Sequence, residues 1–207
     1  MYPLSATSKV STQLWYHVGS KDKCSGEKGL THFLEHMLFK GTERMAESDI
    51  NLFSHKLSGY CNAFTSYDTT IYLFDMPSQH WHVVLPVFVD CMQHARLDQE
   101  HINSELKTVI QELKMYRDEY SGHLFDELVS TIFADHPYHY PTIGFKHNLW
   151  NLKREALSQF YRTHYIPNNA TLVIVGNVNP DEVYRCVKME FGGLKGNPDY
   201  KKRVFYH

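Results

Sequence analysis

Four segments of the chain have the residue pattern of β-strands. Residues 10–18 alternate between apolar and polar side chains, which is typical of a strand with one buried face. Residues 60–66 and 69–75 are rich in aromatic and β-branched residues, and a tight turn at residues 67–68 joins them as a hairpin. The apolar sequence TLVIVG at 171–176 predicts a fourth strand.

Apolar residues with helical spacing predict most of the other elements. The predicted helices cover residues 31–39, 50–57, 78–95, 99–120, 123–133 and 153–164, and a last helix begins at Asn179 and Pro180. Ser48 and Asp49 cap the second of these helices, and Asp98 caps the longest. Pro86 kinks the third helix or shifts its start, and Gly122 separates the longest helix from the next one.

The order of these elements predicts an α+β fold. Strands and helices follow one another without the regular strand–helix–strand alternation of a parallel sheet. We therefore expect a mixed, largely antiparallel sheet with helices packed mainly on one face. The length of 207 residues corresponds to one domain, and no linker or internal repeat divides it. A single domain over residues 1–207 is expected.

The composition excludes several functional classes. Acidic and basic residues nearly cancel, giving a net charge of −2, which argues against a nucleic-acid groove or a basic membrane-binding patch. The chain has no apolar run of about 18 residues that would span a membrane, and its first twenty residues lack a signal-peptide pattern. The four cysteines, at positions 24, 61, 91 and 186, are widely spaced and favour a reducing compartment. We therefore expect a cytoplasmic protein.

Candidate chemistry begins with His32-Phe33-Leu34-Glu35-His36 in the first predicted helix. Residues four apart share a helix face, so His32 and His36 can bind one metal ion, with Glu35 beside them. A carboxylate next to a zinc-activated water can accept its proton, and the HxxEH order is the inverse of the commoner HExxH. Chance alone gives roughly 0.05 such motifs in a chain of this composition. The alternative is a surface helix with two unrelated histidines.

A third metal ligand is available in the longest predicted helix. Glu105 and Glu112 are seven residues apart, which places them within about 20° of the same helix face. Two carboxylates on one buried face need a cation or hydrogen-bond donors to compensate their charge. The alternative is an ordinary solvated helix face.

The residues then match a known family over nearly the whole chain. The sequence resembles the M16 metallopeptidases, which include pitrilysin, insulin-degrading enzyme and the mitochondrial processing peptidase. The family signature is HxxEH followed by a glutamate about 75 residues later, and 75 residues lie between His36 and Glu112. The other matching blocks lie, in the same order as in the family, at residues 29–43, 59–72, 105–119, 136–144 and 160–183.

The resemblance implies roles for the five polar residues of the motif and the long helix. His32, His36 and Glu112 would bind zinc, and Glu35 would be the general base. Glu105 would support catalysis by holding a zinc-ligand histidine through its second ring nitrogen.

The resemblance also implies a site for peptide substrates on the segment from Gly59 to Thr65. An extended peptide would add a strand to this edge, with its backbone close to Asn62 and Ala63. Without the resemblance, Asn62 is an ordinary turn or sheet residue. The expected function is a zinc-dependent endopeptidase that cleaves extended peptides or unstructured polypeptides with a metal-activated water.

Two departures from the family pattern affect this expectation. Family domains begin with an additional strand, for which too few residues precede the strand at 10–18. Family enzymes also form their active chamber from two homologous halves, and this chain corresponds to the N-terminal, metal-bearing one. The expected partner is a homologous second half or subunit, or a second copy of the chain. The alternative function is a metal- and peptide-binding half-domain, or a structural subunit, with little activity without its partner.

Overall fold

The computed structural model describes residues 7–22, 27–202 and 205, and for residues 51–54 it describes the backbone alone. The strands are β1 (Lys9–Tyr16), β2 (Tyr60–Thr65), β3 (Thr70–Pro77) and β4 (Ala170–Gly176). The α-helices are α1 (Leu30–Leu38), α2 (Glu47–Lys56), α3 (Leu85–His94), α4 (Gln99–Asp118), α5 (Tyr120–Ile132), α6 (Lys146–Trp150), α7 (Arg154–His164) and α8 (Pro180–Phe191). Short 3-10 helices are η1 (Ser20–Asp22), η3 (Trp81–Val84), η4 (Pro137–His139) and η5 (Pro167–Asn169).

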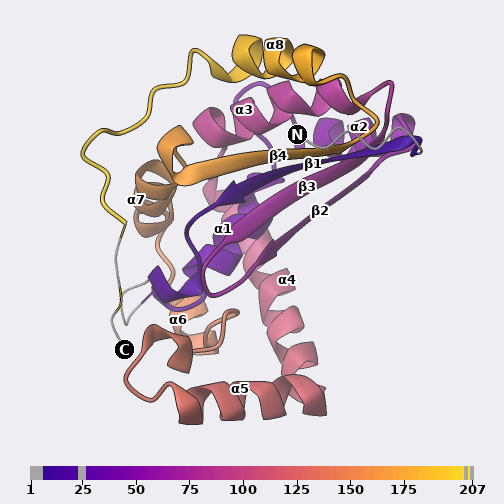
Figure 1. Cartoon of the computed structure of the whole chain (residues 1–207). Coiled ribbons are helices and arrows are strands. Elements are labelled where there is room, and N and C mark those ends of the chain that lie inside the picture. Colours follow the sequence, from indigo (N-terminus) through magenta and orange to yellow (C-terminus); the bar gives the residue numbers. More distant parts are fainter. Residues whose placement is uncertain (1–6, 23–26, 203–204, 206–207) are drawn as a thin grey trace.

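The four strands form one sheet with the order β2-β3-β1-β4 (Figure 1). Every neighbouring pair is antiparallel, and Leu14 of β1 lies opposite both Tyr72 of β3 and Leu172 of β4. Among the strands that the structure describes, β2 pairs with β3 alone and therefore forms an edge of the sheet. The predicted α+β fold is confirmed.

One face of the sheet carries the hydrophobic core. Leu14 and Tyr16 of β1 and Tyr72 and Phe74 of β3 point to this face and are at most 2% exposed. They pack with apolar side chains of α1, α3, α4 and α7 in one cluster. A smaller cluster around Val10 joins β1 to η3, α3 and α8. Burial of each large apolar side chain stabilises the fold by about 1.5–3 kcal/mol, so this face holds the helices on the sheet.

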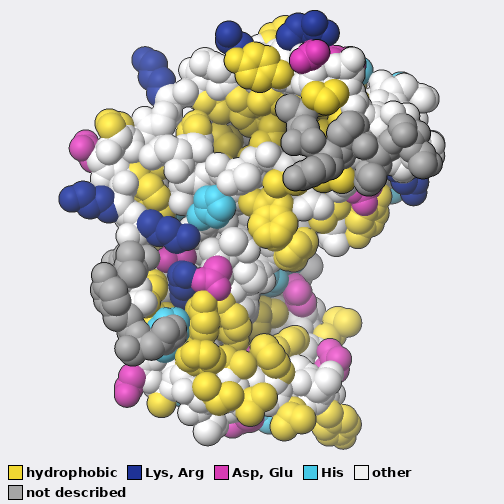
Figure 2. Space-filling model, in the orientation of Figure 1, with side chains coloured by type: hydrophobic (Ala, Val, Ile, Leu, Met, Phe, Trp, Pro, Cys, Tyr) yellow, Lys and Arg dark blue, Asp and Glu magenta, His cyan; other side chains and the backbone are white. Residues whose placement is uncertain are grey.

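The α4 helix extends away from the sheet, and α5 lies across its far end (Figure 1). The apolar residues Leu124, Phe125, Leu128 and Ile132 of α5 are between 51% and 71% exposed. Figure 2 shows hydrophobic side chains gathered in this lower part of the molecule, and a hollow between it and the sheet. The molecule therefore presents an uncovered apolar helix beside a concave surface.

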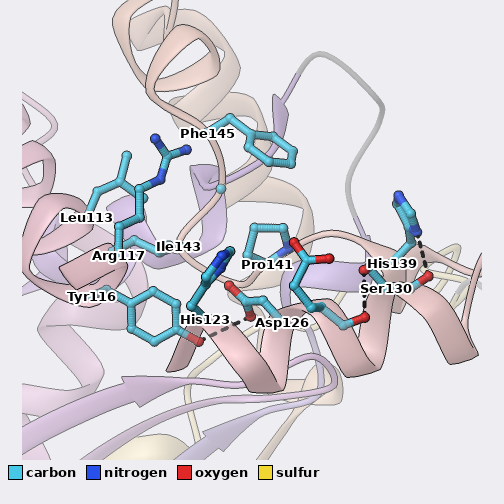
Figure 3. Close-up of a pocket in the computed structure, with 12 residues that line it drawn as sticks. Leu113, Tyr116, Arg117, His123, Asp126, Ser130, His139, Pro141, Ile143 and Phe145 are labelled. Carbon is cyan, nitrogen blue, oxygen red and sulfur yellow. Dashed lines mark hydrogen bonds between the residues drawn. The ribbon is translucent and has the colours of Figure 1, made fainter. Parts of the chain in front are cut away.

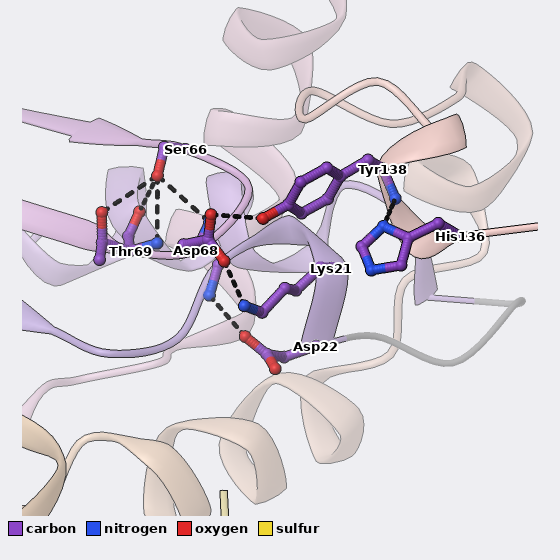
Figure 4. Close-up of polar contacts among 8 residues, drawn as sticks. Lys21, Asp22, Ser66, Asp68, Thr69, His136 and Tyr138 are labelled. Atoms are coloured by element: carbon purple, nitrogen blue, oxygen red, sulfur yellow. Dashed lines mark hydrogen bonds and ion pairs between the residues drawn. The ribbon is translucent and has the colours of Figure 1, made fainter. Parts of the chain in front are cut away.

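The connection between β2 and β3 is a tight turn, as predicted at residues 67–68. Ser66 Oγ accepts a hydrogen bond from the backbone N–H of Asp68 at 3.3 Å. The Asp68 carboxylate pairs with the Lys21 ammonium group and accepts a 2.6 Å hydrogen bond from the Tyr138 hydroxyl (Figure 4). These contacts attach the tip of the hairpin to η1 and η4.

Proline and asparagine set two helix starts as expected. Pro86 shifts the start of the third predicted helix: η3 comes first, and α3 begins at Leu85 with the proline in its first turn. A proline is tolerated there because the first N–H groups of a helix have no intrahelical acceptor. Asn179 caps α8, since its side-chain oxygen accepts from the backbone N–H groups of Asp181 and Glu182.

Two predicted helix boundaries were wrong. Gly122 does not separate the two long helices, because it lies inside α5; the break is at Glu119, whose backbone is extended. Ser48 and Asp49 do not precede the second helix as N-cap residues, because they lie inside its first turn. It begins at Glu47, and the Asp49 carboxylate reaches back to accept a 2.9 Å hydrogen bond from Ala46 N–H.

Two sequence predictions concern residues outside the described ranges. Cys24 and the segment before residue 7, where the additional family strand would lie, are not described. The division of the chain into a single catalytic half therefore stays a prediction. Within the described ranges, no helix has both the length and the apolar character needed to cross a membrane.

Candidate metal centre

The α1 helix buries one side and presents two histidines on another. Its residues Phe33, Leu34 and Met37 are fully buried in the main core cluster. His32 and His36 are one turn apart, with 4.7 Å between their ring centroids. Burial of the apolar side of α1 therefore fixes the position of both imidazoles.

Glu112 of α4 completes a triangle of donor atoms with these histidines. Its Oε1 lies 3.5 Å from His32 Nε2, and its Oε2 lies 3.3 Å from His36 Nε2. The three ligand atoms lie within 4.8 Å of one another and form the one His/Cys/Asp/Glu group of this kind in the described part of the chain. Donor atoms around a tetrahedral zinc ion with bonds of about 2.0–2.1 Å are about 3.3 Å apart. The donor types and their spacing therefore fit a zinc ion.

Glu105 of α4 lies behind His36. Its Oε1 is 2.8 Å from His36 Nδ1, and the residue is only 4% exposed. Its other oxygen, Oε2, is 2.8 Å from Lys40 Nζ, and the same ammonium group is 2.8 Å from Glu47 Oε1. Both ring nitrogens of His36 thus face a carboxylate, with Nε2 directed towards Glu112.

The charges of this cluster shift the pKa values of its members. Burial lowers the pKa of His36, but hydrogen bonds to Glu105 and Glu112 outweigh burial and raise it to about 9. Burial raises the pKa of Glu105, but its bonds to His36 and Lys40 outweigh burial and lower it below its ordinary value. Hydrogen bonds from His32 and His36 hold the pKa of Glu112 well below its ordinary value. Both carboxylates are therefore ionised at neutral pH and stabilise positive charge here.

Glu35 lies on α1 between the two histidines in sequence and is 8% exposed. Thr65 Oγ1, at the end of β2, donates a 2.5 Å hydrogen bond to Glu35 Oε2. Burial raises the pKa of Glu35, and the charge of His32 and the bond from Thr65 offset part of this rise. A carboxylate with a raised pKa is suited to accept and return a proton near neutral pH.

The two histidines differ in how their second ring nitrogen is held. His36 Nδ1 faces Glu105, whereas His32 Nδ1 is buried and has no hydrogen-bond partner among the residues that the structure describes. A histidine that binds a metal through Nε2 is oriented by the partner of its Nδ1. The protein therefore orients His36 more firmly than His32.

Two neighbouring cavities share part of their lining, and the smaller one reaches the cluster. The smaller, of about 190 Å³, is lined by His32 and Glu112 and by aromatic residues that include Tyr116 and Phe125. The larger, of about 490 Å³, lies between α4, α5 and the loop after η4 (Figure 3). Tyr116 and Asp126 line both cavities, and the Tyr116 hydroxyl donates a 3.1 Å hydrogen bond to Asp126 Oδ1. The metal cluster thus opens towards space that can take side chains of a ligand.

The predicted substrate residues lie on the edge strand β2. Asn62 is exposed and Ala63 is partly buried, and Ala63 lies opposite Tyr72 of β3. Asn62 Oδ1 accepts a 2.9 Å hydrogen bond from Ala63 N–H. The structure places both residues on the strand that ends at Thr65, and their role in substrate binding stays a prediction.

Two contacts of the cluster, those of Lys40 and Thr65, were not predicted from the sequence. Lys40 continues the spacing of four residues set by His32 and His36, and this spacing could have indicated it. The contact of Thr65 with Glu35 depends on how β2 crosses α1, for which the sequence carries no local signal.

The chain matches two profiles of one peptidase family. The profile described as Insulinase (Peptidase family M16) matches residues 3–146, which include every residue of the cluster. The profile described as Peptidase M16 inactive domain matches residues 151–206.

Curated relatives come from bacteria and a plant. The zinc protease PqqE of Helicobacter pylori is 29% identical over 190 residues, which cover 91% of this chain and 43% of that protein. The uncharacterised zinc protease YmxG of Bacillus subtilis is 30% identical over 186 residues, covering 90% of this chain and 45% of that protein. A probable mitochondrial-processing peptidase subunit beta of Arabidopsis thaliana is 28% identical and covers 89% of this chain and 35% of that protein. The chain spans less than half the length of these relatives.

Solved structures agree with these matches. A protease from Helicobacter pylori superposes with a TM-score of 0.92 at 28% identity, covering 99% of this chain and 49% of that one. The first half of the periplasmic protease PqqL from Escherichia coli superposes with a TM-score of 0.87 at 25% identity, covering 97% of this chain and 44% of that one. The chain therefore belongs to peptidase family M16, a family of zinc proteases.

Proposed function

We propose that this chain is the metal-binding half of a zinc endopeptidase that cleaves extended peptides or unstructured polypeptides. The observation that carries the proposal is the triangle of His32 Nε2, His36 Nε2 and the Glu112 carboxylate, with the buried Glu35 beside it. Three protein ligands of these types leave one position for water, as in catalytic zinc sites.

Each polar residue of the cluster would have a distinct task. His32, His36 and Glu112 would hold the zinc ion. When bound, zinc acts as a Lewis acid on a carbonyl oxygen and lowers the pKa of a water molecule. Glu35 would accept a proton from the attacking water as the water oxygen bonds to the peptide carbon. It would then deliver this proton to the amide nitrogen as the C–N bond breaks and the amine leaves. Glu105 would keep His36 oriented.

The edge strand β2 would position the substrate. A peptide in extended form can pair with an open strand edge through backbone hydrogen bonds, which select for extended shape rather than for one side chain. Asn62 and Ala63 lie on this edge, and Thr65 links its end to Glu35. The cavity lined by Tyr116 and Phe125 would receive a substrate side chain near the bond to be cleaved.

A second M16 half would complete the site. The chain covers 43–45% of its bacterial relatives PqqE and YmxG and 49% of the Helicobacter pylori protease structure. The hollow beside α5 is open on the face shown in Figure 2. A homologous partner facing this hollow would enclose the peptide and exclude bulk water.

The test is hydrolysis of a quenched unstructured peptide by this chain mixed with a homologous second half. Activity should disappear after chelation and return with zinc. The control is the same peptide segment held inside a stably folded domain, which should resist cleavage. Equal cleavage of the folded and unstructured forms would contradict selection for extended chains. Zinc binding without any hydrolysis would instead support a binding role alone.

A further inference from the structure

Lys40 contacts two carboxylates at the back of the metal cluster. It lies one turn beyond His36, just after the end of α1, and is partly buried. Its ammonium group is 2.8 Å from Glu105 Oε2 on α4 and 2.8 Å from Glu47 Oε1 at the start of α2. Lys40 therefore joins three helices at one point.

The buried carboxylate of Glu105 requires compensation of its charge. Glu105 is 4% exposed, and its two oxygens are divided between His36 Nδ1 and Lys40 Nζ. A histidine that binds zinc through Nε2 is neutral and donates its Nδ1–H. The pair of His36 and Glu105 would then carry one net negative charge. Lys40 compensates this charge, because it is the one lysine or arginine that pairs with Glu105 in the described part of the chain.

We propose that Lys40 is a positioning residue of the metal centre. It fixes the Glu105 carboxylate so that Oε1 faces His36 Nδ1, and in this way it directs His36 Nε2 towards Glu112. A lysine suits this task because its ammonium group can donate to both Glu105 and Glu47. The inference rests on the proposed zinc-binding function.

The competing explanation is that Lys40 only ties α1, α2 and α4 together. A structural tie would lower the stability of the fold but leave the zinc affinity of the folded protein unchanged. A positioning role predicts that the effect of Lys40 on zinc binding passes through Glu105. Zinc affinity of the folded variants separates the two explanations, and a double-mutant cycle on that affinity tests the path through Glu105, because coupled residues give non-additive changes.

The experiment measures zinc affinity by competition with a chromogenic chelator, without any substrate. Lys40→Gln should bind zinc about 10-fold more weakly or worse, the usual range for loss of such supporting contacts. Lys40→Arg, which keeps the charge, should recover most of the affinity. In a Glu105→Gln background, Lys40→Gln should cause little further loss. Lys107→Gln is the matched control, since it removes an exposed lysine two residues from Glu105.

Three outcomes would overturn the inference. They are wild-type affinity in a folded Lys40→Gln variant, the same fold-loss in the Glu105→Gln background, and an equal loss in the Lys107→Gln control. If Lys40→Gln fails to fold, Lys40→Met supplies the same comparison, because it keeps an unbranched apolar stem without the charge. A wild-type chain that binds no zinc would overturn the proposed function itself, and this inference with it.

Discussion

The Thr65 hydroxyl donates a 2.5 Å hydrogen bond to Glu35 Oε2 and thereby joins the edge strand β2 to the proposed general base. Thr65 is the last residue of β2, and Glu35 lies on α1 between the two histidines. The hydrogen bond therefore fixes the position of the proposed general base relative to the strand that would align a peptide. Preserving this relation matters because small errors in position cost reaction rate.

Thr65→Val should lower kcat/KM for peptide hydrolysis about 10-fold. The variant keeps the shape of the side chain but loses the donor, and a hydrogen bond to a charged group contributes about 1.5–3 kcal/mol at most. Thr65→Ser, which keeps a hydroxyl, should retain most of the activity. Zinc content should be the same in all three proteins. If Thr65→Val is as active as the wild type, the bond has no part in catalysis.

Glu35→Gln should keep the fold and the bound zinc while losing hydrolysis by about 10²-fold or more. A neutral amide cannot accept the proton of the attacking water. The measurements are zinc content by metal analysis and peptide cleavage in the presence of a second half. Undiminished activity in this variant would remove Glu35 from the mechanism.

Glu112→Gln should lose most of its zinc, because two neutral imidazoles alone bind the ion weakly. Metal analysis after gel filtration gives the occupancy. Glu100→Gln is the matched control, since Glu100 is an exposed glutamate on the same helix. Full occupancy in Glu112→Gln would mean that another residue is the third ligand.

The parts of the site that were predictable from the sequence follow from local geometry. A helix places residues four and seven apart on one side. A shared helix face could therefore be expected for His32 and His36, and likewise for Glu105 and Glu112. The bridge from Lys40 to Glu105 joins α1 to α4, and it depends on how these helices cross. The break at Glu119 was missed because glycine favours helix ends only on average, and Gly122 is accommodated inside α5.

The pairing of Asp68 with Lys21 and Tyr138 should make stability depend on pH (Figure 4). Burial raises the pKa of Asp68, but these two partners outweigh burial and lower it below its ordinary value. A lowered folded-state pKa adds stability above the unfolded value of about 3.9, and this stability is lost as the pH falls through the folded value.

Asp68→Asn should therefore melt below the wild type at pH 7, and the difference should shrink below about pH 4. The side chain is 48% exposed and screened by solvent, so we expect at most about 1 kcal/mol, or a few degrees in Tm. Thermal melts from pH 7 to pH 3 give the comparison, with Asp118→Asn as the exposed control. A constant difference across this range would show that Asp68 acts through packing rather than charge.

The chain alone should be a poor peptidase, and a homologous second M16 half should raise its activity by about 10²-fold or more. Alone, the strand β2 can align a peptide from one side, and we expect the groups that clamp the backbone from the opposite side and donate to the developing oxyanion to come from the second half. Loss of one such donor costs about 10²–10³ in rate. The exposed apolar residues of α5, which include Leu124 and Leu128, also remain uncovered.

Titrating the second half into a fixed amount of chain, with a quenched unstructured peptide as substrate, should give a saturating rise in rate. The same titration with the Glu35→Gln chain should stay flat, which excludes activity of the added half. Strong zinc-dependent turnover by the monomeric chain, unchanged by the second half, would contradict this prediction.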